Sequence, residues 1–373
     1  MRRIFQWLLR KPLTWLANHF SSSPNQKAVF ASLSKLLKDI HTDKDNAGPI
    51  VPFIWNEGKF VIVSDQHKGI RDGADDFRNA EKNYLAALDF YYQKGFTLIN
   101  NGDAEELWEN TPAKVMENNH AALSAELQFL QQDRYYRIYG NHDLEWKYDI
   151  QRNSFLTPFF GDKLKIVEGV ILQTQFEDQQ YEILISHGHQ GDQKSDGNPF
   201  STWVVAALWT PVQRFLDISI NTTSDSFELI DKHNIMMYEW SASQKNLIFI
   251  SGHTHKPVFA SLDHIDQIQQ QIEKAQRENN IAAIPALAQA LRERKVEYSG
   301  KGLIRTKAQP SYFNSGCCCF SDGDMTTIEI DSGRIRLVKW QYENEQPVRK
   351  VLEESELGYV LGSLTDSIIQ EVP

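Results

Sequence analysis

The chain has 373 residues, of which 41% are hydrophobic and 24% are charged, with a formal net charge of −10. This composition is typical of a globular protein with ample material for a core, and the negative charge argues against nucleic acid as a partner. No segment reaches the roughly 18 consecutive apolar residues of a membrane-spanning helix.

Residues 1–48 are predicted to form a helical extension. Residues 1–20 combine four basic residues with Trp, Phe and Leu, but the apolar run is too short for a signal peptide. This segment suits either an interfacial membrane anchor or a helix that packs on its own domain or on a partner. Residues 25–41 carry apolar residues at helical spacing, which predicts a second amphipathic helix.

Strands and helices alternate in the first half of the main domain, which is predicted to span residues 49–345. Apolar runs rich in β-branched residues indicate the strands, and apolar residues at helical spacing indicate the helices. This alternation is typical of α/β units with a largely parallel sheet. The predicted strands are residues 59–63, 96–100 and 135–139, and the predicted helices are residues 80–94 and 112–130.

The second half of the main domain is predicted to be richer in β-strands and to carry two insertions. Residues 190–245 contain an apolar stretch at 200–218 and are expected to form a helical cap over a site. Residues 263–295 are a polar helical excursion, and residues 346–373 form a C-terminal tail without a clear signal. The predicted strands are residues 165–176, 181–186, 246–250, 311–314, 317–320, 326–330 and 334–340.

The three cysteines are consecutive, at residues 317–319. An odd and contiguous set cannot form a disulfide framework, so a reducing cytoplasm is the expected location. Metal sites of the thiolate type need spaced ligands, so we expect these residues to have a structural role in a buried strand.

Five of the predicted strands end at polar side chains that can bind metal ions. Ligands at the carboxyl ends of strands can meet in one crevice. Carboxylate, amide and imidazole groups together suit Mn²⁺, with Fe or Zn²⁺ as alternatives. Seven ligands exceed the needs of one ion, so two ions that share a carboxylate are expected. The seven residues are Asp65, His67, Asp103, Asn141, His187, His253 and His255.

The ordered blocks around these residues resemble the motifs of the calcineurin-like metallophosphoesterases over residues 59–340. The resemblance implies a four-layer α/β/β/α sandwich, here with a helical cap insertion and N-terminal helices. It also implies that Asp103 bridges the two ions. The blocks are Asp65-Gln66-His67, Gly102-Asp103, Gly140-Asn141-His142-Asp143, His187 and Gly252-His253-Thr254-His255. By resemblance, the first ion is held by Asp65, His67 and His255, and the second by Asn141, His187 and His253.

The resemblance implies a hydrolase that cleaves a phosphate monoester, diester or pyrophosphate bond. A hydroxide that bridges two cations is a nucleophile near neutral pH. In the family, the residue at the position of His142 acts as general acid or stabilises the transition state, and Asp143 orients it. The expected substrate is a phosphorylated small molecule, a nucleotide or a lipid-linked compound, and a catalytically inactive metal-binding scaffold is the alternative of another class.

One branch of the family, the UDP-2,3-diacylglucosamine pyrophosphohydrolases, combines similar blocks with a helical insertion. If this chain resembles that branch, residues 1–20 could hold it at the cytoplasmic face of a membrane. His189 departs from the branch, because a carboxylate is usual there, and it is expected to contact the substrate, to support another residue of the site or to face solvent. The acidic and aromatic residues at 105, 106, 108 and 109 could line the pocket, but we favour the start of a helix for them.

Overall fold

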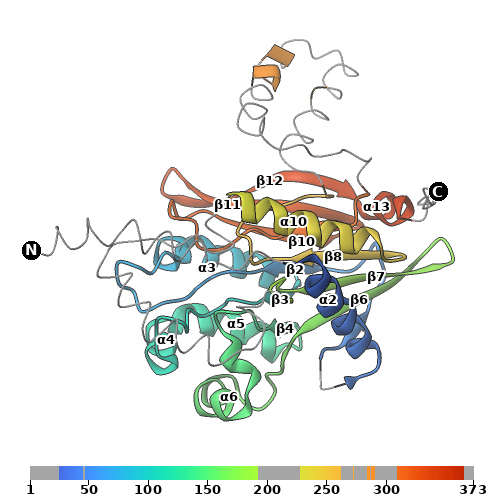
Figure 1. Cartoon of the computed structure of the whole chain (residues 1–373). Coiled ribbons are helices and arrows are strands. Elements are labelled where there is room, and N and C mark those ends of the chain that lie inside the picture. Colours follow the sequence, from blue (N-terminus) through green and yellow to red (C-terminus); the bar gives the residue numbers. More distant parts are fainter. Residues whose placement is uncertain are drawn as a thin grey trace, which may run out of the picture.

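The computed structural model describes residues 25–44, 47–191, 227–261 and 309–364, together with residues 272, 284, 285 and 287–289. Two β-sheets pack face to face, and helices cover the outer face of each sheet (Figure 1). This four-layer α/β/β/α arrangement confirms the predicted fold class. None of the helices in the described ranges has the length and apolar character needed to cross a membrane. The predicted segment at residues 1–20 and the apolar stretch at residues 200–218 lie outside these ranges.

The larger sheet has seven strands in the order β12-β11-β10-β2-β3-β4-β5. Strands β2 to β5 are parallel to one another, whereas β10, β11 and β12 form an antiparallel meander that joins the sheet beside β2. The turn at Ser332-Gly333 connects β10 and β11. The strands are β2 (Phe60–Val63), β3 (Thr97–Asn101), β4 (Tyr135–Ile138), β5 (Ile166–Val167), β10 (Met325–Asp331), β11 (Arg334–Glu343) and β12 (Gln346–Glu356).

The smaller sheet has five strands in the order β1-β6-β7-β8-β9. Strands β7, β8 and β9 are parallel, so their carboxyl ends lie at one edge of the sheet. Strand β6 pairs with β7 in the antiparallel sense and with β1 in the parallel sense. The strands are β1 (Ile50–Pro52), β6 (Gly169–Phe176), β7 (Gln179–Ser186), β8 (Leu247–Ser251) and β9 (Tyr312–Asn314).

Strand β2 shows why the sheets stack in this way. Its four residues are all buried, and they alternate between two cores because successive side chains of a strand point to opposite faces. Phe60 and Ile62 belong to the core between the two sheets, whereas Val61 and Val63 belong to the core beneath the helices. A strand that is buried on both faces reads as a continuous apolar run, which is how β2 was predicted.

Helices cover both sheets. On the seven-stranded sheet, α3, α4, α5 and α7 contribute to the core, and on the five-stranded sheet α2 and α10 do so. The predicted helix at residues 25–41 is confirmed as α2, and Asn25 caps it by accepting hydrogen bonds from the amides of Lys27 and Ala28. The helices are α2 (Gln26–His41), α3 (Phe77–Gln93), α4 (Pro112–Asn118), α5 (His120–Gln131), the 3₁₀ helix η2 (Leu144–Lys147), α6 (Asp149–Phe155), α7 (Thr157–Phe160), α10 (Phe227–Ala242) and α13 (Leu357–Ser363).

Two predicted elements are each divided in the structure. The predicted helix at residues 112–130 breaks at the buried Asn119, whose side chain donates to the carbonyls of Gly69 and Val115 at 2.8 Å each. The predicted strand at residues 165–176 is divided at Glu168 into β5 and β6, which belong to different sheets. In both cases a tertiary contact overrides a continuous local pattern.

The predicted strand at residues 317–320 is wrong, because the cysteines lie in a loop. The amide of Cys318 donates to the carbonyl of Asp65 at 3.1 Å, and the carbonyl of Cys317 accepts from Thr326 at 3.0 Å. These bonds hold the loop against the end of β2 and against β10 without forming a strand. Cys317 and Cys318 are buried and Cys319 is half-buried.

The fold continues past residue 345, where the C-terminal tail was predicted to begin. Strand β12 pairs with β11 along its whole length and forms the edge of the seven-stranded sheet. The following helix α13 buries Leu357, Val360 and Leu361 in the core between the sheets. Strand β12 is exposed and mostly polar, so it lacks the apolar pattern by which a strand is predicted.

The described part of the predicted cap is a helix of the sandwich. Within residues 190–245, helix α10 buries Met236, Met237 and Trp240 against the five-stranded sheet. Residues 192–226 and most of the predicted excursion at 263–295 lie outside the described residues. The cap over the site therefore stays a prediction for residues 192–226 only.

Candidate metal centre

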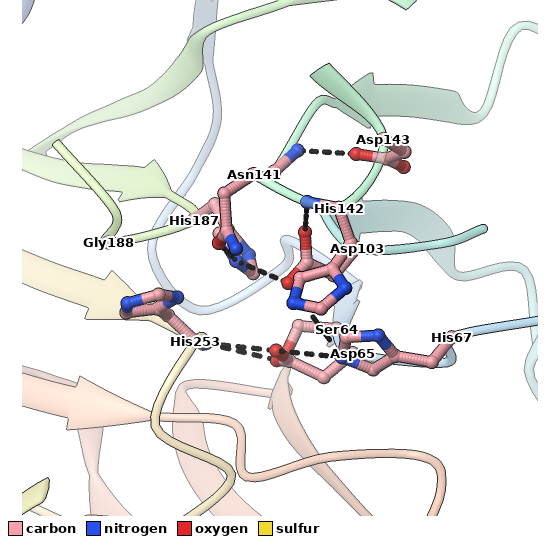
Figure 2. A network of polar contacts seen from close by, with 12 residues as sticks. Ser64, Asp65, His67, Asp103, Asn141, His142, Asp143, His187, Gly188 and His253 are labelled. Atoms are coloured by element: carbon pink, nitrogen blue, oxygen red, sulfur yellow. Dashed lines mark hydrogen bonds and ion pairs between the residues drawn. The ribbon is translucent and has the colours of Figure 1, made fainter. Parts of the chain in front are cut away.

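The five predicted strand ends meet at one edge of the sandwich (Figure 2). The loops after β2, β3 and β4 approach from the seven-stranded sheet, and the loops after β7 and β8 approach from the five-stranded sheet. Parallel strands bring their carboxyl ends to the same edge, which explains the convergence. All seven predicted ligands lie in this cluster: Asp65, His67, Asp103, Asn141, His187, His253 and His255.

The backbone at this cluster is left-handed at five of the seven ligands. The φ angles of Asp65, His67, Asp103, His253 and His255 lie between 48° and 69°. Residues other than glycine rarely adopt this region, and such strain concentrates at functional sites. The sharp turns bring two side chains of one loop toward the same centre, as with His253 and His255.

Two glycines leave the space that the carboxylates occupy. A Cβ atom on Gly140 would lie 2.1 Å from Oδ1 of Asp103, and a Cβ atom on Gly252 would lie 2.5 Å from Oδ2 of Asp65. Any side chain at either position would push a carboxylate out of place. The glycines in the Gly-Asn-His-Asp and Gly-His-Thr-His blocks are thus explained by close packing against the ligands.

One group of ligand atoms gathers around His67 and His255. Their Nε2 atoms are 3.1 Å apart, and Nε2 of His255 lies 3.3 Å from Oδ1 of Asp65. Nε2 of His67 lies 3.7 Å from Oδ2 of Asp103. These separations match those between ligands of a common ion, because each ligand atom lies about 2.0–2.3 Å from such an ion.

A second group gathers around His187 and shares Asp103 with the first. Nε2 of His187 lies 3.0 Å from Oδ2 of Asp103 and 3.2 Å from Oδ1 of Asn141. The ligand atoms of Asp103, His187 and His253 all lie within 4.8 Å of one another. Nε2 of His253 is buried without a hydrogen-bond partner. A buried polar atom without a partner is costly, so the residues present fit a bound metal ion.

The charges in the cluster compensate one another. Burial raises the pKa of Asp65 and of Asp103, but the surrounding histidines outweigh it and hold both pKa values below the ordinary range. Burial opposes the charged imidazole, yet Asp103 raises the pKa of His187 to about 9 and Asp65 raises that of His255 to about 10. Burial and the nearby His233 and His187 hold the pKa of His253 well below its ordinary range, so this ring is neutral.

His142 lies in the cluster but is held by a different carboxylate from the one predicted. Its Nδ1 contacts Glu106 Oε2 at 2.7 Å, and the same oxygen contacts Nδ1 of His67 at 3.0 Å. Asp143 was expected to orient His142, but its carboxylate is hydrogen-bonded elsewhere in this structure. The Asp143 carboxylate accepts from the amides of Gly140 at 2.6 Å and Ala104 at 2.9 Å. Asp143 therefore fixes the backbone of two loops.

The pKa values follow from this arrangement. Burial lowers the pKa of His142, but Glu106 and Asp103 outweigh it and raise the value to about 9. Burial raises the pKa of Glu106, but His142 and His67 lower it to about 2. Burial, with Asp103 and Glu105 nearby, raises the pKa of Asp143 to about 7.

Glu106 was predicted only as a residue that could line the pocket, because the start of a helix was the favoured interpretation of its loop. The helix begins only at Pro112, and residues 104–111 wrap around the site. Trp108 stacks on the His142 ring with centroids 3.9 Å apart, and its Nε1 donates to the carbonyl of Asn141 at 2.8 Å. The signal in the sequence was a carboxylate and an aromatic residue directly after the Gly-Asp block.

His189 is buried, which excludes the solvent-facing alternative, and its contact with a substrate stays a prediction. Its ring centroid lies 5.4 Å from that of His187, and burial with the nearby His187 lowers its pKa to about 3. A further histidine, His233 of α10, was not predicted. Its Nε2 contacts the carbonyl of Gly188 at 2.8 Å, and its ring lies 5.2 Å from that of His253. The second group thus combines the charged ring of His187 with the neutral rings of His189 and His253.

A fully buried network of four charges lies beside the ligand loops. Nζ of Lys68 lies 2.6 Å from Glu126 and 3.5 Å from Glu105, and Arg137 is paired with Glu105. Buried charges of this kind are tolerated only when they are paired. Lys68 follows the ligand His67 directly and Glu126 belongs to α5, so the network ties the helical layer to the site.

Comparisons with known proteins give limited information. No protein-family model matches the sequence, and no curated protein matches it. Among solved structures, the chain is similar to Vacuolar Protein Sorting 29 from Cryptosporidium parvum, with 11% identity, a TM-score of 0.32, and coverage of 80% of this chain and 98% of that chain. A dimetal phosphatase from Danio rerio has 9% identity and a TM-score of 0.34, with 79% of this chain and 99% of that chain covered.

A cold-active protein tyrosine phosphatase is also similar, with 12% identity, a TM-score of 0.34, and coverage of 84% of this chain and 83% of that chain. At these values, similarity alone says nothing about what this chain binds or catalyses.

Proposed function

We propose that the chain is a metal-dependent phosphoesterase of the calcineurin-like type, with two divalent ions held at the cluster. The observation that supports this best is the position of Asp103. Its Oδ2 atom lies 3.7 Å from Nε2 of His67 in the first group and 3.0 Å from Nε2 of His187 in the second. A carboxylate shared between two ligand groups is what a bridging ligand requires.

The side chains around the two groups have separate roles in this proposal. Asp65, His67 and His255 would hold one ion, and Asn141, His187 and His253 would hold the other. When bound, two such ions lower the pKa of a water molecule and neutralise the oxygens of a phosphate ester. Mn²⁺ fits the carboxylate, amide and imidazole ligands, with Fe or Zn²⁺ as alternatives.

His142 would supply the proton to the leaving oxygen. Its Nδ1 contacts Glu106, which leaves Nε2 to face a substrate, and the side chain is 21% exposed. In the metal-free protein Glu106 and Asp103 raise the pKa of the ring to about 9, which favours the protonated form that a general acid requires. Trp108 stacks on the ring and limits its rotation. This set of contacts supports an enzyme over an inactive metal-binding scaffold.

The test is reconstitution of metal-free protein with Mn²⁺, Zn²⁺ or Co²⁺, followed by assay with an aryl phosphate, an aryl phosphodiester and a pyrophosphate. We expect turnover, and we expect Asp103→Ala to reduce it by about 100-fold or more, since one carboxylate would serve both ions. Glu117→Gln, an exposed change on α4, is the matched control. Metal binding without turnover of any substrate in this series would favour the scaffold and overturn the proposal.

The class of substrate can be identified by comparing turnover of a wider series of compounds. The series should include nucleotides and lipid-linked diphosphates, because the resemblance to the UDP-2,3-diacylglucosamine pyrophosphohydrolases predicts a lipid-linked substrate. That prediction depends on residues 200–218, outside the described ranges. Membrane contact through residues 1–20 is tested by co-sedimentation with anionic liposomes. Equal sedimentation of the full chain and of a variant without residues 1–20 would refute the anchor.

A further inference from the structure

The cysteine loop is attached to the strand ends that carry the ligands. The amide of Ser315 donates to the carbonyl of Ser251 at 2.9 Å, and the amide of Cys318 donates to the carbonyl of Asp65 at 3.1 Å. The hydroxyls of Ser64 and Ser315 are in contact at 2.7 Å. The loop after β9 is thus bound at several points to the ends of β2 and β8, which fixes where its side chains lie.

The three thiols of this loop point to different surroundings. The thiol of Cys318 lies in the core beneath the helices, where it contacts the carbonyl of Thr326 at 3.9 Å. Sγ of Cys319 lies at the first group of ligands instead. It forms a set with the imidazole nitrogens of His67 and His255 in which all ligand atoms lie within 4.8 Å of one another. Cys317 is buried.

This geometry suits one common ion. Sulfur ligands lie about 2.3 Å and nitrogen ligands about 2.0–2.1 Å from zinc, so two ligands of one ion can be separated by up to roughly 4.4 Å. The ligand atoms of His67, His255 and Cys319 all lie within 4.8 Å of one another, which is of the same order as this value. Asp65 contacts His255 in the same group, so the ligand set would combine oxygen, nitrogen and sulfur.

We infer that the thiolate of Cys319 is a further protein ligand of the ion held by Asp65, His67 and His255. This inference rests on the proposed function, because it concerns the same metal centre. A thiolate favours Zn²⁺, Co²⁺ or Fe²⁺ over Mn²⁺, since softer ions prefer sulfur. The two metal positions would then differ, with a softer ion beside Cys319 and an ion held by oxygen and nitrogen beside Asn141.

Cobalt spectroscopy tests the inference without an activity assay. Metal-free protein is titrated with Co²⁺ under argon, with a phosphine reductant that contains no thiol. We expect visible d–d bands and a near-ultraviolet sulfur-to-cobalt charge-transfer band. In Cys319→Ser the charge-transfer band should disappear while the d–d bands remain, and the affinity for Co²⁺ should fall by about tenfold or more. Cys317→Ser, the same change two residues away, should keep the band.

The outcomes separate the inference from the proposed function. Visible d–d bands without a charge-transfer band in the wild type, or a full band in Cys319→Ser, would overturn the inference and leave the metal centre intact. Absence of Co²⁺ binding, or binding that is unchanged in Asp103→Ala, would overturn the proposed function itself.

A second measurement uses the wild-type protein and does not depend on the folding of a variant. Iodoacetamide labelling is followed by mass spectrometry with and without saturating Zn²⁺. We expect Zn²⁺ to slow the labelling of Cys319 by at least tenfold. Equal labelling of Cys319 in both conditions, in protein shown to contain zinc, would refute the assignment.

Discussion

Glu106→Gln should lower the pKa of His142 and shift the pH dependence of activity. The Glu106 carboxylate contacts Nδ1 of His142 at 2.7 Å, and it is one of the two charges that raise the pKa of this ring to about 9. A glutamine keeps the size of the side chain and removes the charge. The protonated form of His142 would lose a partner, so the ring would release its proton at a lower pH.

The magnitude follows from the type of contact. A hydrogen bond to a charged group contributes about 1.5–3 kcal/mol, and one pKa unit corresponds to about 1.4 kcal/mol, so the pKa should fall by roughly one to two units. The basic limb of the profile of kcat against pH should move to lower pH by the same amount. Activity above that limb should fall by about tenfold or more, whereas activity on the acidic side should change little.

The assay is a pH–rate profile at saturating metal, because Glu106 also contacts the predicted ligand His67. An NMR titration of the His142 ring in the zinc-loaded protein gives the pKa directly. Glu117→Gln is the control, and it should leave the profile unchanged. The basic limb must vanish in His142→Ala, which should lose about 100- to 10,000-fold in kcat if the ring is the general acid. An unchanged pKa of His142 in Glu106→Gln would refute this reasoning.

Three further outcomes are expected. Asp143→Ala should lower the free energy of unfolding by roughly 2–4 kcal/mol in urea denaturation, because two buried amides lose their acceptor, and an unchanged midpoint would contradict this. Gly140→Ala should reduce bound metal by about tenfold or more, measured by elemental analysis with circular dichroism as the fold control, since its Cβ displaces Asp103. The pKa values of His187 and His255, about 9 and 10, mean that both rings are protonated at pH 7 without metal. Because ions bind the neutral ring, metal affinity should rise by about tenfold per pH unit for each displaced proton up to pH 9, and calorimetry that shows no proton release would contradict this.

The fold and the ligand positions could be predicted because their signals are local. Strand β2 is a run of apolar residues that ends at Asp65, and the structure places the predicted ligands at the ends of such runs. Because parallel strands have their carboxyl ends at one edge of a sheet, the predicted ligands are expected to lie close together. The packing needed to order the four layers follows from the alternation of side chains in each strand.

The contacts of His142 could not be predicted in this way. The residue next to it in the sequence, Asp143, turns to the backbone amides of two loops, whereas Glu106, which is 36 residues away, reaches the ring. Which of the two carboxylates, Asp143 or Glu106, contacts the His142 ring depends on the path of the loop at residues 104–111. Strand β12 was not predicted for another reason. Its pairing with β11 depends on backbone hydrogen bonds, which produce no pattern of apolar residues in the sequence.

The left-handed backbone at five predicted ligands lowers the stability of the fold while it positions the side chains for metal binding. Each such residue carries strain of roughly 1 kcal/mol or more, and a domain has only about 5–15 kcal/mol of net stability. Selection of this chain for heat resistance in the absence of metal would therefore favour glycine or asparagine at these positions, which relieves strain and removes ligands. Laboratory evolution toward a more robust scaffold should be carried out with metal present, so that binding energy offsets the strain.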